Sequence, residues 1–187
     1  NEQVKYPRPF QLPGDAEVVN LLARASELGI NLLDTAPAYG TSQARLGQLL
    51  PGPRERWVVV SKVGEFFEHG ESRFDFSFDT TVRVVEQSLR TLNMEYLDLV
   101  LIHSDGNDLQ ILEQEGALDA LRVLKERGLI RAHGMSSKTI DGGLRTVQEM
   151  DVVMATCNPD YLDDIPVLEA ATRCGSPRIV FASSSSV

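Results

Sequence analysis

The sequence predicts an α/β protein built around a parallel β-sheet. Short apolar runs alternate along the chain with amphipathic segments, which is the order expected of βαβ units. The runs are almost continuously apolar, as in strands that are covered on both faces. With 187 residues the chain is long enough for one domain with a sizeable core.

Helices are predicted where apolar residues recur at helical spacing between start and stop signals. The first follows the turn and N-cap at Pro13-Gly14-Asp15 and ends at Gly29. The second runs from the cap Ser42 to the stop at Pro51-Gly52-Pro53, and Gly116 interrupts the fourth. The expected helices are residues 17–28, 42–50, 78–92, 108–127, 142–150 and 165–173.

Strands are predicted at the apolar, β-branched runs between these helices. They cover residues 30–33, 57–61, 96–102, 129–135, 151–155 and 178–182. The segment between the second strand and the third helix, residues 64–77, is interpreted as a long loop with several phenylalanines. Long loops in compact domains tend to be functional.

Composition argues against several classes of protein. The net charge of −9 disfavours nucleic-acid binding, which needs a basic face. No apolar run reaches the roughly 18 residues of a membrane span, and no signal peptide is visible, so we expect no membrane association. Cys157 and Cys174 have neither metal-binding nor redox spacing, which favours free thiols in a reducing cytoplasm.

The stretch from Asn31 to Gly40 is the first candidate for a site. Its strand ends on Asp34, and the turn that follows, marked by Pro37, carries Tyr39. An acid and a phenol at the carboxyl end of a parallel strand suggest a functional site. The alternative is structural, with Asp34 capping the next turn and Tyr39 packing on the surface.

Two further strands end on an ionisable residue, Lys62 and His103. Taken separately, each has an ordinary explanation, a solvated lysine or a hydrogen-bonded structural histidine. In a parallel barrel, however, the carboxyl ends of all strands meet at one rim. Asp34, Tyr39, Lys62 and His103 would then share one pocket.

These four side chains suit the protonation of an oxyanion. A phenol has a reference pKa near ~10, which a nearby ammonium lowers, and a carboxylate holds that ammonium in place. An imidazole beside them can orient a carbonyl oxygen through a hydrogen bond. The hydride for such a reaction must come from a cofactor, because no side chain supplies one.

Three segments of the chain resemble the aspartate–tyrosine–lysine–histidine motifs of the aldo-keto reductase superfamily. They are Asp34-Thr-Ala-Pro-Ala-Tyr39-Gly40, Val60-Ser61-Lys62 and Leu101-Ile102-His103. The resemblance extends from about Asp15 to Ala171. It implies a (β/α)8 TIM barrel that reduces an aldehyde or ketone to an alcohol with NADPH.

The resemblance also implies a role for each of the four residues. Tyr39 is expected to be the general acid, and Lys62 to tune it. Asp34 is expected to pair with Lys62, and His103 to orient the substrate carbonyl. The alternative, from another class, is a catalytically weak regulatory or interaction protein that binds the cofactor on the same barrel.

Cofactor-binding positions follow from the same resemblance. The segment Gly134-Met-Ser136-Ser137 resembles the family's strand end that holds the nicotinamide carboxamide. Met154 stands where the family usually has a glutamine, and a thioether cannot make that bond. The last run resembles the family's eighth strand and the turn that accepts the cofactor phosphates. The predicted cofactor-binding residues are Ser136, Ser137, Asn158, Ser183 and Ser184.

The predicted strand count departs from the family's. Six strands fall short of the eight in a (β/α)8 barrel, and the first and seventh strand segments are apparently absent. We expect residues 1–187 to form a single barrel domain, with segments of a longer chain missing before Asn1 and between Cys174 and Gly175. A truly shortened protein is the alternative.

Overall fold

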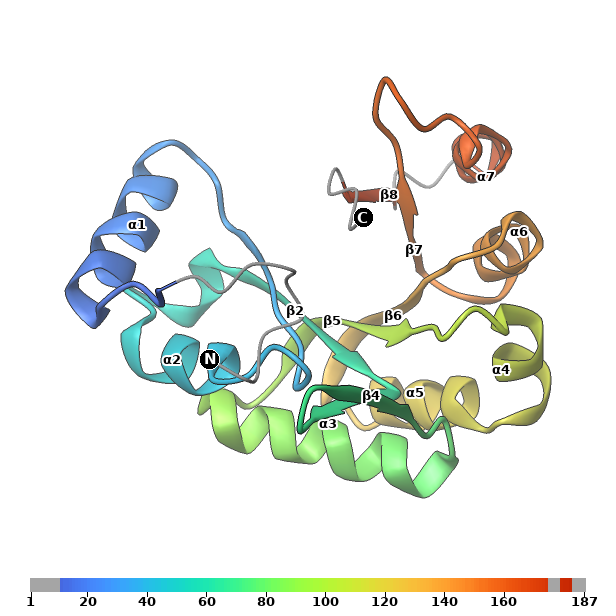
Figure 1. Cartoon of the computed structure of the whole chain (residues 1–187). Helices are drawn as coiled ribbons and strands as arrows, with labels where there is room; N and C mark the ends of the chain where they lie inside the picture. Colours follow the sequence, from blue (N-terminus) through green and yellow to red (C-terminus); the bar gives the residue numbers. More distant parts are fainter. Residues whose placement is uncertain (1–10, 175–178, 183–187) are drawn as a thin grey trace.

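The computed structural model describes residues 11–174 and 179–182, and its main feature is a six-stranded parallel sheet (Figure 1). The strands follow the order β1-β2-β5-β6-β7-β8, and each pairs in parallel with its neighbour. Their bounds are β1 Leu32–Asp34, β2 Val58–Val63, β5 Leu97–His103, β6 Ile130–Ser136, β7 Val152–Thr156 and β8 Ile179–Ala182.

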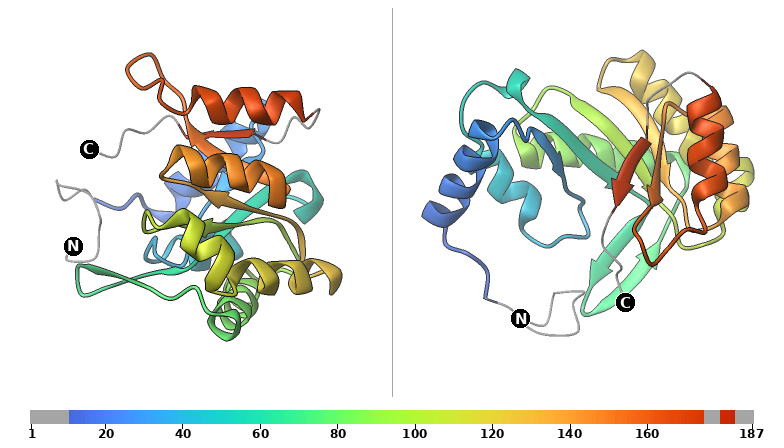
Figure 2. Two further views of the ribbon diagram at one scale, coloured as in Figure 1. Left: turned by 90° about the vertical axis from the view of Figure 1, so that its right-hand side faces the viewer. Right: turned by 90° about the horizontal axis from the view of Figure 1, so that it is seen from above.

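Helices follow the strands and lie on the outer side of the sheet, which curls away from them (Figures 1 and 2). Parallel neighbours need such crossovers, because a tight turn cannot return the chain to the same end of the sheet. A 3-10 turn, η1 (Arg54–Arg56), precedes β2. The helices are α1 Asp15–Glu27, α2 Ser42–Leu49, α3 Phe78–Leu92, α4 Asp108–Gln114, α5 Ala117–Glu126, α6 Ile140–Glu149 and α7 Ile165–Arg173.

The two faces of the sheet bury different sets of residues. Successive side chains of a strand point to opposite faces, so the outer face of β2 carries Val59 and Val63 while its inner face carries Val60. The outer residues join the main core beneath α3 and α5. A smaller inner cluster consists of Val60, Leu99, Leu101 and Met154.

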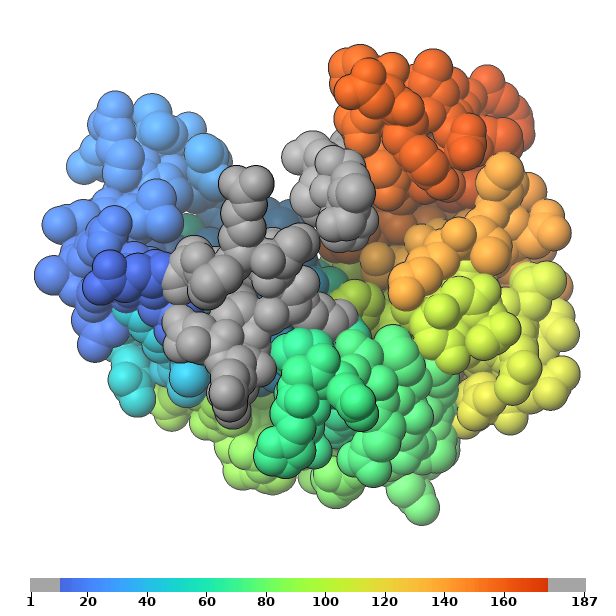
Figure 3. All heavy atoms as spheres, viewed as in Figure 1, coloured from blue at the N-terminus to red at the C-terminus, as the bar shows by residue number. Residues whose placement is uncertain are grey.

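The predicted α/β class, the parallel pairing and all six predicted strands are confirmed. The complete barrel is not: the sheet is a partial barrel, whose outline in the space-filling view is notched between α1 and α7 (Figure 3). The last strand, β8, was expected to correspond to the family's eighth strand. It pairs directly with β7, with Val153 opposite Ile179 and Thr156 opposite Ala182. It takes this place because it is the next strand along the chain after α7. The predicted gaps, before Asn1 and between Cys174 and Gly175, fall at residues outside the described ones.

The predicted loop at residues 64–77 is wrong, because most of it forms an antiparallel hairpin. Its strands are β3 Glu65–Glu68 and β4 Glu71–Phe74. The two residues between them, His69 and Gly70, both have positive φ, 53° and 84°. That is the mirror-image turn that suits hairpins, but a histidine at its first position is not the usual signal.

The first strand is also less buried than predicted. Ile30 is 55% exposed and Leu32 is 42% exposed, because β1 is an edge strand that has only β2 as a neighbour among the described residues. Within residues 11–174, no helix is long and apolar enough to cross a membrane.

Candidate active site

The candidate site lies at the carboxyl ends of β1, β2 and β5, three adjacent strands. Lys62 has the same parity on β2 as the inner residue Val60, and His103 the same parity on β5 as Leu101. Both side chains therefore belong to the inner face, above the small apolar cluster. The sequence pattern predicted this convergence, and the structure brings the residues together.

Lys62 and Asp34 form the tightest contact of the site. Lys62 Nζ donates a hydrogen bond of 2.5 Å to Asp34 Oδ1 and one of 3.3 Å to the carbonyl oxygen of Thr35. This confirms the expected pairing of the ammonium with a carboxylate. The lysine side chain is 3% exposed and the aspartate side chain 36%, so the charge of Lys62 is the more deeply buried one.

Burial is the largest influence on the protonation of Lys62. Desolvation lowers the pKa of its ammonium from the usual 10.5, while the Asp34 carboxylate, through its charge and its hydrogen bond, opposes that shift. The charge of Glu65, like that of Asp34, acts to raise the pKa of Lys62. The group is therefore a cation that gives up its proton more readily than a lysine in water.

Tyr39 lies over this lysine. The Nζ atom is 4.7 Å from the centre of the phenol ring, within the range of a cation–π contact. The rings of Tyr39 and His103 meet edge to face, with centroids 6.3 Å apart and planes at 87°. Tyr39 is 39% exposed, so its ring closes one side of the site and still faces solvent.

Polar contacts behind the sheet fix the turn that carries Tyr39. The hydroxyls of Thr35 and Ser42 lie 2.8 Å apart, at the two ends of the turn. Gln43, buried at the start of α2, donates through Nε2 to Ser61 Oγ on β2 and to Ser88 Oγ on α3. The turn is thus tied to the residue preceding Lys62. Nothing in the sequence pattern indicated that this glutamine is buried.

Glu65 is a further residue that sequence reasoning missed. It begins β3, is 4% exposed, and places Oε2 2.7 Å from Nδ1 of His103. The oxygen lies off the line of an Nδ1–H bond, so this is a close ion-pair contact rather than an aligned hydrogen bond. The one signal that could have drawn attention to Glu65 is its position three residues after Lys62, but nothing in the sequence indicated that it is buried.

The predicted carboxamide-binding segment lies beside His103. Ser136 ends β6, where it pairs in register with His103 on one side and with Met154 on the other. Ser137 follows it, and both serines are partly exposed. Ser136 has the inner-face parity of Ala132, whereas Oγ of Ser137 lies 3.2 Å from the position of a Cβ at Gly143 on α6. A hydroxyl can both donate and accept a hydrogen bond, as a carboxamide requires.

A buried carboxylate, Asp108, holds the turn after these serines. Its Oδ2 accepts hydrogen bonds from the backbone nitrogens of Lys138 and Thr139, at 2.9 and 2.8 Å, and from the hydroxyl of Thr139 at 2.7 Å. Its Oδ1 accepts from Ser104 Oγ. Asp108 therefore joins the segment after β5 to the segment after β6. The sequence identified it only as the start of a helix.

Asn158, another predicted cofactor residue, makes its contact within its own turn. Asn158 Oδ1 accepts a hydrogen bond from the backbone of Asp160, so its carbonyl serves its own turn. Met154 is 7% exposed and packs in the inner apolar cluster, where it offers no polar contact. Ser183 and Ser184 lie outside the described residues.

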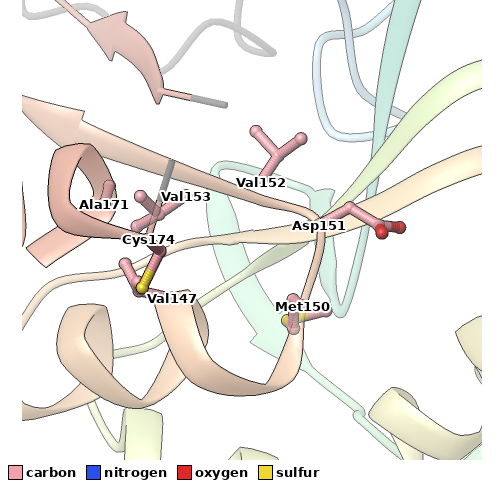
Figure 4. Close-up of a pocket in the computed structure, with 7 residues that line it drawn as sticks. All are labelled: Val147, Met150, Asp151, Val152, Val153, Ala171 and Cys174. Atoms are coloured by element: carbon pink, nitrogen blue, oxygen red, sulfur yellow. The ribbon is translucent and has the colours of Figure 1, made fainter. Parts of the chain in front are cut away.

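A pocket of the described chain lies at the opposite end of the strands. Val152 and Val153 at the start of β7, with residues from the ends of α6 and α7, line it (Figure 4). It is separate from the Lys62 site. Among residues 11–174, no group of three or more histidines, cysteines, aspartates and glutamates is placed to hold a metal ion.

A curled parallel α/β sheet, with its polar site at the carboxyl ends of the strands, defines the class of barrel-type α/β proteins. The family model described as the Aldo/keto reductase family matches residues 12–165. The chain belongs to the aldo/keto reductase family, which confirms the resemblance of its motifs.

Named relatives agree with this assignment. D-arabinose 1-dehydrogenase of Saccharomyces cerevisiae is 33% identical over 134 residues, which cover 69% of this chain and 39% of that protein. L-galactose dehydrogenase of Arabidopsis thaliana is 29% identical over 171 residues, 82% of this chain and 52% of that protein. The chain thus spans about half the length, or less, of these two curated relatives.

Solved structures show the same fold. The protein PA4992 of Pseudomonas aeruginosa, described as an aldo-keto reductase, has a TM-score of 0.89 and 51% identity over 92% of this chain and 68% of its own. An aldo-keto reductase of Bacillus halodurans in its holo form has a TM-score of 0.74 and 26% identity over 90% of this chain and 57% of its own.

Proposed function

We propose that this protein reduces an aldehyde or ketone to an alcohol with NADPH, and that Tyr39 donates the proton. The observation that carries the proposal is the placement of Lys62. Its buried ammonium lies between the Asp34 carboxylate, at 2.5 Å, and the face of the Tyr39 ring, at 4.7 Å from its centre. A cation held there favours the phenolate that remains once the proton has left.

Each side chain has a separate task in this reaction. Asp34 fixes the lysine, Lys62 stabilises the negative charge on Tyr39, and Tyr39 gives its hydroxyl proton to the carbonyl oxygen. His103 orients that oxygen through a hydrogen bond. The hydride added to the carbonyl carbon comes from the nicotinamide, so the carbonyl gains one hydride and one proton and becomes an alcohol.

The residues of this chain that would hold the nicotinamide are Ser136 and Ser137. Their hydroxyls at the end of β6 suit the carboxamide, and Asp108 keeps the turn beyond them in place. Preference for NADPH over NADH and a cytoplasmic location are parts of the same proposal. Both rest on the family resemblance, and the second also on two cysteines that form no disulfide.

The substrates to test first are small polar carbonyl compounds. Relatives of this chain are named as dehydrogenases of D-arabinose and L-galactose, and another as a methylglyoxal reductase. A panel of methylglyoxal, short aldehydes and aldoses covers these chemistries. The aldoses are assayed in the oxidative direction with NADP⁺ and NAD⁺, because dehydrogenation at the anomeric hydroxyl transfers a hydride in the opposite direction, from substrate to nicotinamide.

The substitution Tyr39→Phe tests the proton donor. It removes one hydroxyl and keeps the ring above Lys62, so folding and NADPH affinity should hardly change. Turnover of the carbonyl should fall by the ~10²–10⁴-fold that a positioned general acid contributes. Tyr96→Phe is the matched control, because Tyr96 lies at the amino end of β5 under Arg54 and Arg131. Loss of the Tyr96 hydroxyl should leave turnover of the carbonyl unchanged.

The alternative is a regulatory protein that binds the cofactor and turns over little. One observation favours it: Met154 is buried beside Ser136, at the position where the family usually has a carboxamide-binding glutamine. The same experiment separates the two functions. If the full protein binds NADPH but wild type and Tyr39→Phe reduce the whole panel equally slowly, the regulatory function replaces the enzymatic one.

A further inference from the structure

Glu65 is a buried acid next to the candidate site, outside the four residues that the motifs predicted. The chain leaves β2 at Val63, bends at Gly64 with φ of +100°, and enters the hairpin at Glu65. A side chain at Gly64 would clash with Phe76, whose ring carbon lies 2.2 Å from the position of a Cβ atom. This bend brings Glu65 back across the strand ends toward His103.

The carboxylate of Glu65 makes two polar contacts of different kinds. Oε1 accepts a hydrogen bond of 2.7 Å from Ser72 Oγ, on the partner strand of the hairpin. Oε2 lies 2.7 Å from His103 Nδ1. The hydroxyl satisfies one oxygen without balancing its charge. A buried carboxylate is costly to desolvate, and the contact with the imidazole can offset part of that cost.

The charges of the site then divide into two pairs. The Lys62 ammonium is matched by Asp34 through a direct hydrogen bond, with Tyr39 over its other side. Glu65 acts on Lys62 through space, and it is in direct contact with His103. Asp34 with Lys62 therefore forms one pair and Glu65 with His103 the other, and the Tyr39 ring contacts Lys62 and His103.

We propose that Glu65 is a positioning residue. Its carboxylate, in close contact with Nδ1 of His103, forms a dyad with the imidazole and holds the ring with Nε2 toward the substrate carbonyl. This inference rests on the proposed carbonyl reduction. Both nitrogens belong to one rigid planar ring, so a contact that fixes the position of Nδ1 also fixes the direction of Nε2.

The glutamates of the hairpin differ in their surroundings. At its far end Glu68 lies opposite Glu71, a like-charge pair in an exposed position that stabilises nothing. The buried glutamate, by contrast, is the one that faces the candidate site. The hairpin thus serves to carry Glu65 to His103, and the imidazole is oriented from behind as carboxylates orient metal-bound histidines.

The test compares Glu65→Leu and Glu65→Gln with Glu68→Gln, a change at the exposed end of the same strand. In the full protein, Glu65→Leu should lower kcat for carbonyl reduction by about 10–100-fold, the effect typical of a lost orienting carboxylate. NADPH affinity should stay unchanged. Glu65→Gln should retain more activity, because its amide can accept from Ser72 and donate to Nδ1. Glu68→Gln should behave as wild type.

A spectroscopic measurement tests the dyad without relying on turnover. The chain has three histidines, so ¹⁵N and ¹H spectra of the imidazoles can be assigned by single substitutions. The ¹⁵N shifts of His103 should differ between wild type and Glu65→Leu, because the carboxylate lies 2.7 Å from Nδ1 in wild type. The signals of His69 and His133 should be unchanged. Should Glu65→Leu not fold, Glu65→Gln decides, because an amide places no carboxylate charge at Nδ1.

Each outcome is decisive. Identical His103 spectra in wild type and the Glu65 variants would overturn the dyad and leave Glu65 as an anchor of the hairpin. Changed His103 signals together with an undiminished kcat in Glu65→Leu would refute the positioning role. A wild type that reduces no carbonyl compound would refute the proposed function, while the spectrum would still report on the dyad.

Discussion

At the scale of single residues, the pair of Lys62 and Asp34 is asymmetric. The lysine side chain is 3% exposed and the aspartate side chain 36%. Removing one partner of a buried pair is costly when it leaves the other charge buried and alone. The two halves of this pair should therefore differ in what their loss does to stability.

Asp34→Asn should lower the free energy of unfolding by about 1–3 kcal/mol, because it leaves a buried ammonium without its carboxylate. Lys62→Met should change it by less than about 1 kcal/mol, because Asp34 can be hydrated and the methionine fills the lysine's space. Both variants should lose carbonyl reduction. Urea unfolding of the two variants measures the difference, and a larger loss for Lys62→Met would contradict the asymmetry.

The lowered pKa of Lys62 also predicts a dependence of stability on pH. Desolvation, the largest cause, places the pKa of the folded state below the 10.5 of the unfolded chain. Between these two values the unfolded chain binds the proton and the folded one does not. The contribution of this group to stability therefore rises with pH up to about 10.5. The free energy of unfolding of wild type and of Lys62→Met, measured at pH 8 and pH 10, isolates this contribution. The increase in this free energy between the two pH values should be smaller in the variant.

At the scale of elements, the hairpin after β2 depends on Gly64. Gly64 is the residue between β2 and β3, and its carbonyl oxygen accepts a hydrogen bond of 2.9 Å from the backbone nitrogen of Asp75. The left-handed φ and the Phe76 ring each exclude a side chain there. The hairpin was predicted as a loop because its strands are short and its turn is a histidine and a glycine.

Gly64→Ala should destabilise the protein by more than its backbone strain alone. Gly29→Ala is the matched control, since Gly29 also has a left-handed φ, +77°, but has no atom within 4 Å of a Cβ. The control should cost about 1–2 kcal/mol, and Gly64→Ala should exceed it because of the clash with Phe76. Thermal and urea unfolding provide the comparison. Equal losses in both variants would mean that the Phe76 ring moves aside freely.

At the scale of the whole molecule, the described sheet has an open edge at β1. Apolar side chains on α1 and near β1 are exposed there, with Leu21 at 66%, Leu28 at 60% and Ile30 at 55%. The sequence predicted that these residues face a core, because helical spacing and an apolar run do not reveal how many neighbours surround an element. An unpaired parallel edge flanked by apolar surface favours association.

The 187-residue chain by itself should therefore self-associate at micromolar concentration, as judged by sedimentation velocity. The double substitution Leu21→Lys with Ile30→Lys should reduce this association, because it places two charges on the exposed apolar surface, and it should not lower the melting temperature. Leu109→Lys is the control, since Leu109 is 41% exposed on α4 at another part of the surface. A chain that stays monomeric at all concentrations would contradict the prediction.

The sequence by itself determined the α/β class, the parallel sheet of six strands and the convergence of Asp34, Tyr39, Lys62 and His103. These follow from local signals, since hydrophobic periodicity sets the elements and strand ends of a parallel sheet share one edge. The sequence motifs were also sufficient to identify the family to which the chain belongs. What the four residues do, and whether Ser136 and Ser137 hold a nicotinamide, stay predictions.

Tertiary structure alone decided which polar residues are buried and what they contact. Gln43, Glu65 and Asp108 look like surface residues in the sequence, because residues of these types are usually exposed, yet all three are buried. Their partners, Ser61, His103 and Thr139, lie far along the chain and are brought near only by the packing of neighbouring strands. Likewise the exposure of β1 depends on its position at the edge of the sheet, which its own apolar residues could not reveal.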